Sequence, residues 1–556
     1  MKMKLFTSIC LIVALVCSLA ACGNSAETTK NSNKTSNKQE TAKFSGTKDK
    51  DMVTVDIRKE PAELNTILTA DVASGNVLRM VLSGLYKLDK NDVPVPDLAE
   101  TTKVSKDGKT YTMTIRKDAK WSNGDPVTAH DFVFAFQEIC KEETASESGY
   151  IVFEHLLNGE DVFEGKKDIS ELGVKAINDH TLKVTFEEPI AYALHLFSLS
   201  SFFPMNQKAY QKIGADKYAK SPDTLITNGA YKLTEWVHDD HIILEKNNEY
   251  YNADEIKLPK IKYVMLQDAN ARMNAFQAGE VDCIDIDGDH YEQAQKSHMP
   301  LKTYVDNSTW YLHFNTKSKL VSNVKIRKAL GMAIDTKSVC EDVLKTGATP
   351  ATGLVPAGVL GADGTPYTKK LGDITEYNVK KAKTLFAEGL KELGIKAKDF
   401  KVSYTFEDGS EYKKEAEFYQ EQWKKVLGID VEIKPMTFKA KVQAMMDGDF
   451  DIVYSGWLPD YNDPITYLGM FVTGNGSNFG QYSNAKYDKL LKAAVKEVDK
   501  TKRQKMLMEA EKIIIDEAAV SPLYFKAVTY TVSDKVDGMV RTGFQEFSFT
   551  NGAKVK

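Results

Sequence analysis

The sequence PVPDLAE at residues 94–100 is followed, at 114–132, by TIRKDAKWSNGDPVTAHDF. Within the second segment, Asn123-Gly124 is typical of a tight turn. Thr128 or Asp131 is in position to cap a helix, because the apolar residues that follow have helical spacing. The two segments therefore predict an ordered series of strand, turn and helix start.

Outward from these segments, stretches with the two-residue apolar period of strands alternate with stretches that have the 3.6-residue period of helices. This alternation predicts a mixed α/β fold. The alternation at 53–57 predicts a half-buried strand, and no repeat of 20 to 50 residues indicates a solenoid. Further strands are predicted at 110–115, 181–186, 242–246 and 261–266, and helices at 77–85, 132–139, 324–334, 411–427 and 503–518.

Composition excludes several classes of protein. A chain of 556 residues is too long for one ordinary core and predicts two or three domains. A mean hydropathy of -0.36 excludes a polytopic membrane protein. The 73 Lys and Arg against 78 Asp and Glu give a net charge of -5, without the basic excess that binds nucleic acid.

The N-terminus has the features of a secretory signal. Lys2 and Lys4 precede an apolar run at 5–21 that is too short for a convincing membrane span. The run ends in Leu-Ala-Ala before Cys22, which resembles the bacterial lipobox and predicts cleavage after residue 21 and acylation of Cys22. An ordinary cleavage site with an incidental Cys is the alternative. The polar residues 24–50 predict a flexible tether that reaches about 30 Å.

The other cysteines predict no disulfide framework. Cys140, Cys283 and Cys340 remain in the predicted body, and an odd number cannot all pair within it. We expect free and mostly buried thiols.

Motifs of enzymes and metal sites fail at specific positions. Gly108-Lys109-Thr110 resembles the end of a phosphate loop, but Lys103 stands where its first glycine is required. The acidic segment 285–289 suggests a calcium loop, but Cys283 and Ala294 occupy two of its ligand positions. No His-Glu-x-x-His or Gly-x-Ser-x-Gly sequence occurs. We expect no catalytic residues, no metal and no cofactor.

Two further segments strengthen the pattern of the opening pair. They are NGAY at 228–231, followed by Trp236, and GWLPDYNDP at 456–464. Together with 94–132 they make the chain after the tether resemble the bacterial extracellular solute-binding proteins of family 5, the oligopeptide-binding lipoproteins of peptide ABC importers.

The resemblance implies an α/β, two-lobe periplasmic-binding-protein-like fold (class II, cluster C) with an extra inserted subdomain. Lobe I would comprise 51–83, 207–308 and 523–556, the inserted subdomain 84–206, and lobe II 309–522. The chain would then cross between lobes near residues 308 and 522, and we expect hinges there.

The resemblance also implies how a peptide would be held. The backbone around Val72 and the segment Ser455, Gly456, Trp457 and Leu458 would flank its main chain as added strands. Asp460 would bind the α-ammonium group through charge-assisted hydrogen bonds. From local sequence alone, Asp460 is a turn residue before Asn462-Asp463-Pro464.

The sequence departs from the short-peptide binders of this family where Arg and His collect the peptide carboxylate. The matching positions are Met445, Tyr412 and Tyr454, and the usual pair of cysteines beside the site reads Ser308 and Leu458. We therefore expect loose length selection, with peptides longer than four or five residues accepted. Aromatic side chains would supply adaptable contacts; they are Trp457, Tyr454 and Phe438, of which Phe438 and Trp457 are equally compatible with core positions.

The leading hypothesis is thus a non-enzymatic, monomeric peptide receptor, lipid-anchored on the extracellular face of a Gram-positive cell membrane, that delivers peptides to ABC permease subunits. Within the same fold, the alternatives are a peptide-pheromone receptor and a nickel or haem binder, which the scarcity of His disfavours. A secreted peptidase or hydrolase is the alternative outside the fold.

Overall fold

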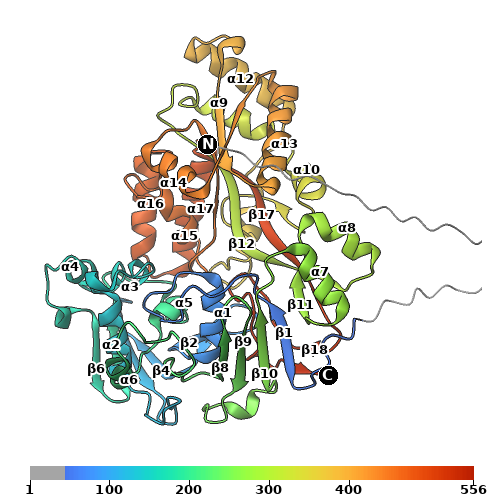
Figure 1. The fold of residues 1–556 in the computed structure, drawn as a ribbon. Coiled ribbons are helices and arrows are strands. Elements are labelled where there is room, and N and C mark those ends of the chain that lie inside the picture. Colours follow the sequence, from blue (N-terminus) through green and yellow to red (C-terminus); the bar gives the residue numbers. More distant parts are fainter. Residues whose placement is uncertain (1–43) are drawn as a thin grey trace, which may run out of the picture. The chain divides into compact units, whose positions relative to one another are not determined.

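Two long antiparallel strands, β12 (Leu301–Phe314) and β17 (Val520–Val532), run through the middle of the computed structural model, which describes residues 44–556 (Figure 1). They are neighbours in an 11-stranded sheet of order β15-β14-β16-β12-β17-β11-β1-β10-β9-β8, in which β13 also pairs with β17. Strands formed by residues 403–457 lie beyond β12, and strands formed by residues 52–285 lie beyond β17. The β12–β17 pair therefore joins two parts of the molecule.

The first strand of this sheet is more buried than its alternation suggests. In β1 (Met52–Asp56) every residue after Met52 is buried, because β1 lies parallel between β10 and β11 and both its faces are covered. The prediction of a half-buried strand was wrong in this respect. The other strands of the sheet are β8 (Tyr231–Val237), β9 (His241–Lys246), β10 (Lys260–Val264), β11 (Cys283–Asp285), β13 (Thr349–Pro350), β14 (Ser403–Glu407), β15 (Glu432–Met436) and β16 (Ile452–Trp457).

The opening segments of the sequence form a second, smaller sheet with a helix beside it. The predicted strand at 110–115 is confirmed as β5, and α2 (Ala129–Ile139) begins after Thr128 as N-cap. The Asp131 carboxylate accepts a hydrogen bond from the Thr128 backbone N–H at 2.8 Å. This sheet has the order β4-β5-β7-β6 and a separate hairpin pairs β2 with β3; their bounds are β2 (Tyr86–Leu88), β3 (Pro94–Pro96), β4 (Ala99–Val104), β5 (Thr110–Ile115), β6 (Val174–Asn178) and β7 (Thr181–Thr185).

The first helix starts and ends earlier than its apolar spacing predicts. Instead of 77–85, α1 covers Val72–Val81, because the Asp71 carboxylate caps it by accepting from Ser74 N at 2.9 Å. Beyond Leu82 the chain is extended, and Ser83 N donates to Asn228 Oδ1 at 2.9 Å. A partner far away in sequence thus fixes the segment that follows the helix.

The remaining helices fall into two groups along the chain. Helices α12, α13 and α14 end at Gly394, Gly428 and Gly448, each in the left-handed conformation that glycine adopts without cost. The first group is α3 (Tyr150–Phe153), α4 (Gly159–Phe163), α5 (Ala193–Leu196), α6 (Gln207–Ile213), α7 (Ala269–Ala278) and α8 (Gly288–Lys296). The second is α9 (Val324–Met332), α10 (Thr336–Ser338), α11 (Tyr367–Leu371), α12 (Val379–Leu393), α13 (Ser410–Leu427), α14 (Phe438–Asp447), α15 (Ile465–Leu468), α16 (Ala485–Lys496) and α17 (Lys500–Asp516).

The buried apolar residues form separate cores on the two sides of the β12–β17 pair. The largest combines residues from Val53 to Cys283 with residues from Tyr530 to Ala553, where β18 (Val536–Asp537) pairs with β19 (Lys554–Val555). Two others consist of residues between Tyr311 and Tyr524. The prediction of a mixed α/β fold is confirmed, and its hydrophobic cores divide into two parts.

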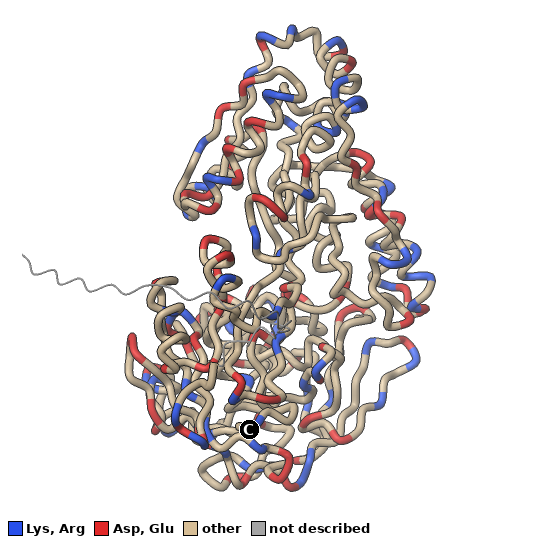
Figure 2. Tube along the Cα trace, turned by 90° about the vertical axis from the view of Figure 1, so that its right-hand side faces the viewer, with Lys and Arg blue, Asp and Glu red and all other residues tan. Residues whose placement is uncertain are grey.

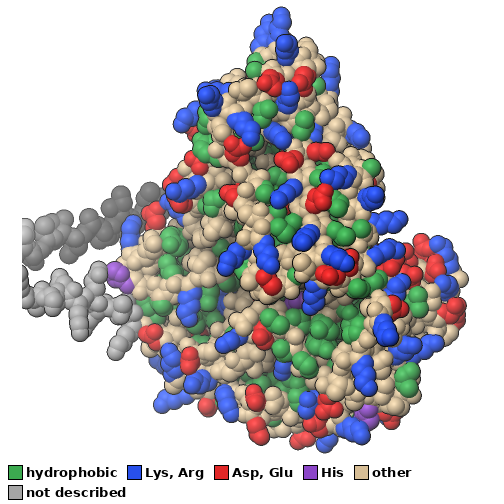
Figure 3. All heavy atoms as spheres, turned by 180° about the vertical axis from the view of Figure 1, so that it is seen from behind, with side chains coloured by type: hydrophobic (Ala, Val, Ile, Leu, Met, Phe, Trp, Pro, Cys, Tyr) green, Lys and Arg blue, Asp and Glu red, His purple; other side chains and the backbone are tan. Residues whose placement is uncertain are grey.

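Charged side chains do not segregate by sign. Lys and Arg are interspersed with Asp and Glu along the coloured part of the trace (Figure 2), and the same mixture, with hydrophobic side chains between, covers the face seen in Figure 3. These faces show no large area of one sign, in keeping with the small net charge of -5.

The predicted signal (1–21), Cys22 and most of the predicted tether (22–50) lie outside the described residues. The last part of the tether segment contacts the body: the Phe44 ring stacks on Phe276 at 5.4 Å, and Thr47 N donates to Asp282 Oδ1 at 2.8 Å. In the part of the chain from 44 to 556, no helix has the length and apolarity to cross a membrane.

Three cysteines of the described chain are free and buried, as the odd count predicts: Cys140, Cys283 and Cys340. Burial raises the pKa of Cys140 and of Cys340 to about 12. These thiols are therefore protonated and unreactive at neutral pH.

Candidate functional site

Strand β16 carries most of the predicted site and has one unpaired edge. On one side it pairs with β12, where Tyr311 lies opposite Ser455, Trp310 opposite Gly456 and Thr309 opposite Trp457. On the other side, β14 pairs with β16 only as far as Val453. From Tyr454 onward, this edge has no strand partner within residues 44–556, so its main-chain groups are available to an added strand.

Around this edge the side chains point in different directions. Ser455, Gly456 and Trp457 are half-buried, and Leu458 is 50% exposed. Tyr454 is 1% exposed and its hydroxyl donates to Glu415 Oε2 at 3.0 Å, so its ring belongs to the core. Tyr454 therefore offers backbone to a ligand, whereas its side chain supports the edge from beneath.

The structure adds Trp310, which the sequence gives no reason to select. Its indole stacks on the Tyr454 ring at 4.9 Å, and a Cβ placed on Gly456 would come within 2.6 Å of it. Gly456 thus leaves the space in which Trp310 lies against the main chain of β16. The Tyr412 ring on α13 lies 6.3 Å from the same indole.

Asp460 follows the edge strand and is held by neutral donors. Its Oδ1 accepts from the Tyr150 hydroxyl at 3.3 Å and its Oδ2 from the Thr466 hydroxyl at 3.5 Å. Burial raises the pKa of this carboxyl, although the two hydroxyls act in the opposite direction. Trp457 Nε1 donates to the same Thr466 hydroxyl at 3.1 Å.

No Lys or Arg within the described chain forms an ion pair with Asp460; the Arg503 guanidinium is instead paired with Asp463 at 2.7 Å. A half-buried carboxylate with only hydroxyl partners is suited to bind a cation.

The remaining predicted residues are spread over other elements. Phe438 is 62% exposed on α14, so the core alternative is wrong for this residue. Met445 is 5% exposed and packs with Phe450 and Val453. Val72, the first residue of α1, is 49% exposed and belongs to the other part of the molecule. Of the predicted set, the structure brings together β16, Asp460 and Tyr412 most closely.

The two parts of the molecule meet beside Asp460. The Tyr192 and Tyr461 rings stack at 4.0 Å, and Lys496 pairs with Glu188 at 2.6 Å. A cavity of about 510 Å³ adjoins this contact, lined by residues of 153–161 and 187–192 together with Lys167, Val495 and Arg503. Its size is that of a small-ligand site.

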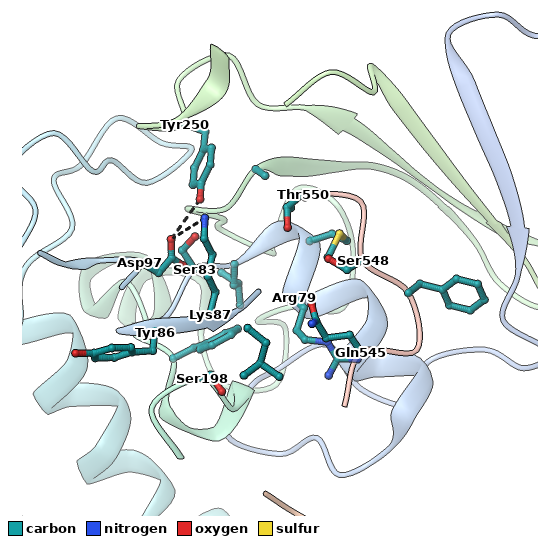
Figure 4. Close-up of a pocket in the computed structure, with 16 residues that line it drawn as sticks. Arg79, Ser83, Tyr86, Lys87, Asp97, Ser198, Tyr250, Gln545, Ser548 and Thr550 are labelled. Atoms are coloured by element: carbon teal, nitrogen blue, oxygen red, sulfur yellow. Dashed lines mark hydrogen bonds and ion pairs between the residues drawn. The ribbon is translucent and has the colours of Figure 1, made fainter. Parts of the chain in front are cut away.

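A second cavity is much smaller. Figure 4 shows it between α1 and the segment 545–550, with Lys87 and the Tyr250 hydroxyl directed at Asp97, at 3.8 and 3.3 Å. Its volume of about 50 Å³ suits a few water molecules and excludes a peptide.

The structure shows what surrounds the positions of the family's cysteine pair and the acidic segment 285–289. At the positions of the family's cysteine pair, the Ser308 hydroxyl donates to Asp306 Oδ1 at 2.6 Å and Leu458 is exposed. In the acidic segment, Asp285 and Asp287 each bind an arginine, Arg541 and Arg272, at 2.5 Å. Arginine thus neutralises two of the three carboxylates that suggested calcium, and the third, Asp289, pairs with Lys414 at 2.6 Å.

Known proteins resemble this chain along nearly all its length. It is 35% identical over 514 residues to the oligopeptide-binding protein OppA of Bacillus subtilis, with 91% of this chain and 93% of the relative covered. A Listeria monocytogenes OppA bound to peptide superposes with a TM-score of 0.73 at 35% identity, covering 91% of this chain and 99% of that one.

The unliganded open form of the murein tripeptide-binding protein MppA superposes better, with a TM-score of 0.78 at 26% identity, covering 92% of this chain and 98% of the other. The TM-score of the peptide-bound OppA is 0.73. The model of the bacterial extracellular solute-binding proteins, family 5, matches residues 93–479, and proteins of this family have two lobes. The predicted two-lobe fold is confirmed, and the chain belongs to bacterial extracellular solute-binding protein family 5.

Proposed function

We propose that this protein captures oligopeptides outside the cell and delivers them to an ABC importer without changing them. The observation that carries the proposal is the unpaired edge of β16 from Tyr454 to Trp457, followed by Asp460 with no cationic partner among the described residues. The similarity to OppA proteins, one of them bound to peptide, supports it.

In this proposal the peptide adds a strand along β16 and places its α-ammonium group at Asp460. Main-chain hydrogen bonds are common to all peptides, so they bind without selecting a sequence. The ammonium replaces hydroxyl donors with a charge-assisted hydrogen bond worth about 1.5–3 kcal/mol. Val72 and the start of α1 would flank the peptide from the other lobe.

The far end of the peptide has no defined receptor. The three positions where short-peptide binders carry Arg and His have no cationic side chain in this protein. They are Met445 and Tyr454, which are buried, and Tyr412. Three glutamates lie near Tyr412 and act on its hydroxyl, namely Glu411, Glu407 and Glu415. None of the three family positions carries a cation for a carboxylate, and Lys441 is paired with Glu407 at 3.3 Å, so we propose that peptides extend past this point and that their length is not tightly selected.

The proposed placement in the cell follows from the N-terminal sequence. Removal of residues 1–21 and acylation of Cys22 would anchor the chain through lipid, with two acyl chains giving stable attachment. The body would act as a monomer made of lobe I (51–83, 207–308 and 523–556), an inserted subdomain (84–206) and lobe II (309–522).

Two experiments test this function. Calorimetry compares a free-amine hexapeptide with its N-acetylated form, and the acetylated form is expected to bind at least tenfold more weakly. Equal affinities would contradict the role of the α-ammonium group.

Mass spectrometry of ligands that co-purify with the protein identifies what it binds in the cell. A mixture of intact peptides is expected. One dominant sequence would favour the pheromone-receptor alternative, and cleavage products would favour a peptidase.

A further inference from the structure

The pairing of β12 with β17, the strands that join the two parts, has two register shifts close together. Between the pairs Val305–Ala527 and Thr309–Phe525, the three residues 306–308 of β12 face Lys526 alone. One pair further, Trp310–Tyr524 is followed by Tyr311–Pro522, which leaves an extra residue on β17. Bulges of this kind bend a strand and increase its twist.

Asn307 lies at the centre of the β12 bulge and has an unusual backbone. Its φ is 61°, the left-handed conformation, which asparagine tolerates better than most residues. The Tyr467 hydroxyl donates to the Asn307 carbonyl oxygen at 2.6 Å. This hydrogen bond holds the Asn307 backbone in place, and the backbone conformation in turn sets the direction of the Asn307 side chain.

The Asn307 carboxamide lies between two glycines from different parts of the molecule. A Cβ on Gly358 would come within 1.7 Å of Asn307 Oδ1, and a Cβ on Gly543 within 2.3 Å of Asn307 Nδ2. Neither glycine has a positive φ, so both are required for space and not for conformation. Gly358 lies between β13 and α11, and Gly543 between β18 and β19, which belong to the two groups of cores.

This carboxamide is buried without being satisfied. Asn307 is 3% exposed, and its Oδ1 has no hydrogen-bond donor among the described residues. A buried acceptor without a donor disfavours the arrangement that contains it. Because the two glycines move with different parts, any rotation of the parts changes what this group contacts.

We propose that Asn307 is a positioning residue at the pivot, whose carboxamide oxygen lacks a donor in the arrangement described here and gains one when the lobes close on a ligand. This rests on the proposed function only for the identity of the ligand as a peptide. Asn307 thereby raises the population of the closed form and the affinity for peptide, without touching the peptide.

The test measures the distance between the lobes in the full chain. Nitroxide labels at Lys208→Cys on α6 and Lys391→Cys on α12, both exposed, report it in a chain in which Cys10, Cys17 and Cys22 are replaced with Ser, because the described native cysteines are buried and do not react. In the free protein, Asn307→Gly is expected to shift the distances between the labels toward longer values. With a tryptic digest of casein as probe, closure is expected to need roughly tenfold more peptide than in the unmutated chain.

A double-mutant cycle separates this role from a general loss of structure. Gly358→Ala displaces the carboxamide and is expected to reproduce the shift, whereas Asn307→Gly combined with Gly358→Ala should match Asn307→Gly alone. Gly476→Ala, which has no neighbour within 4 Å, should change nothing.

Unchanged distances in the free Asn307→Gly protein, or additive effects in the double variant, would overturn the inference. If the unmutated chain did not respond to the digest, the peptide function would fail, while the distances in the free protein would still decide the role of Asn307.

Discussion

Asp460 gains its chemistry from what surrounds it. As a residue of an Asn-Asp-Pro turn region it is unremarkable, but its carboxylate lies half-buried between the hydroxyls of Tyr150 and Thr466. Tyr150 comes from α3 and Thr466 from α15, so the two donors belong to different parts of the molecule. A ligand ammonium at this point would interact with both lobes at once.

Replacing Asp460 with Asn removes the charge and keeps the shape. Asp460→Asn is expected to weaken binding of free-amine peptides by about 10- to 100-fold, because the charge-assisted bond is lost. N-acetylated peptides should bind the variant and the unmutated chain equally, as calorimetry would show. Asp449→Asn, an exposed carboxylate on the same lobe, is the matched control. A uniform loss for both kinds of peptide would instead indicate a structural role for Asp460.

Glu415 supports the site from below and makes stability depend on pH. It accepts from the hydroxyls of Tyr419, Tyr454 and Tyr524 at 2.9, 3.0 and 3.2 Å, and burial raises its pKa from 4.5 to about 7. Between these values the folded state binds more protons than the unfolded state. The free energy of unfolding must therefore fall as the pH rises from about 4.5 to about 7.

Glu415→Gln is expected to flatten this slope, by at most about 3 kcal/mol over the window. Glu511, whose pKa burial also raises to about 7, leaves part of the slope in place. Urea unfolding at a series of pH values measures it, with the exposed Glu417→Gln on the same helix as control. A slope identical to that of the unmutated chain would show that Glu415 does not titrate in this range.

At the scale of elements, local sequence and distant partners share control of where each one starts and ends. Helix α2 is fixed by neighbours in the sequence, since Asp131 accepts from Thr128 N and from Trp121 Nε1. Strand β16 is instead defined by β12 and β14, and its unpaired edge exists only because β14 pairs no further than Val453. A cap can be read from spacing, whereas an unpaired edge cannot.

The capping contact of α2 predicts a local loss of stability. Asp131→Ala removes the acceptor for both the Thr128 N–H and the buried Trp121 indole, so we expect a cost of about 1–2 kcal/mol. Denaturant unfolding would measure it, and peptide affinity should stay unchanged. Asp118→Ala, whose carboxylate is 59% exposed, should cost little. Loss of peptide binding without loss of stability would contradict this assignment.

At the scale of the whole molecule, two parts with separate cores are joined by β12 and β17, both irregular where they cross. Long strands keep the parts in one sheet, and the bulges are where we propose that their relative angle changes. Contacts beside Asp460, such as the Tyr192–Tyr461 stack, lie between the parts. Closure on a ligand would therefore rearrange these aromatic contacts.

The absence of an arginine or histidine at the far end of the site predicts loose length selection. Calorimetry across peptides from two to ten residues is expected to show affinity that rises and then levels, because added residues extend beyond the last defined contact at β16. A sharp maximum in affinity at three or four residues would require a group that binds the peptide carboxylate, and it would contradict the proposal of an open-ended site.

Much of this arrangement is encoded locally. Alternation predicts β5 at 110–115 as found, and helical spacing predicts α13 within one residue of Ser410–Leu427. In both, the signal lies in the element itself and a clear turn or glycine limits it. The prediction for α1 was displaced by five residues at its start because Asp71, a cap outside the apolar run, begins the helix.

The linear order of residues was enough to indicate an α/β chain, since turns, caps and apolar periods act between neighbours. The ordered motifs indicated its family, and the resemblance to that family, not the local sequence, led to the proposal for Asp460. Tyr150, Trp310, Glu415 and Asn307 have no such signal. Their roles arise from partners more than a hundred residues away or on other strands, as in the bond from Tyr150 to Asp460. Burial, sheet register and the space left by Gly358 and Gly456 exist only in the folded chain, and they decide which side chains reach the site.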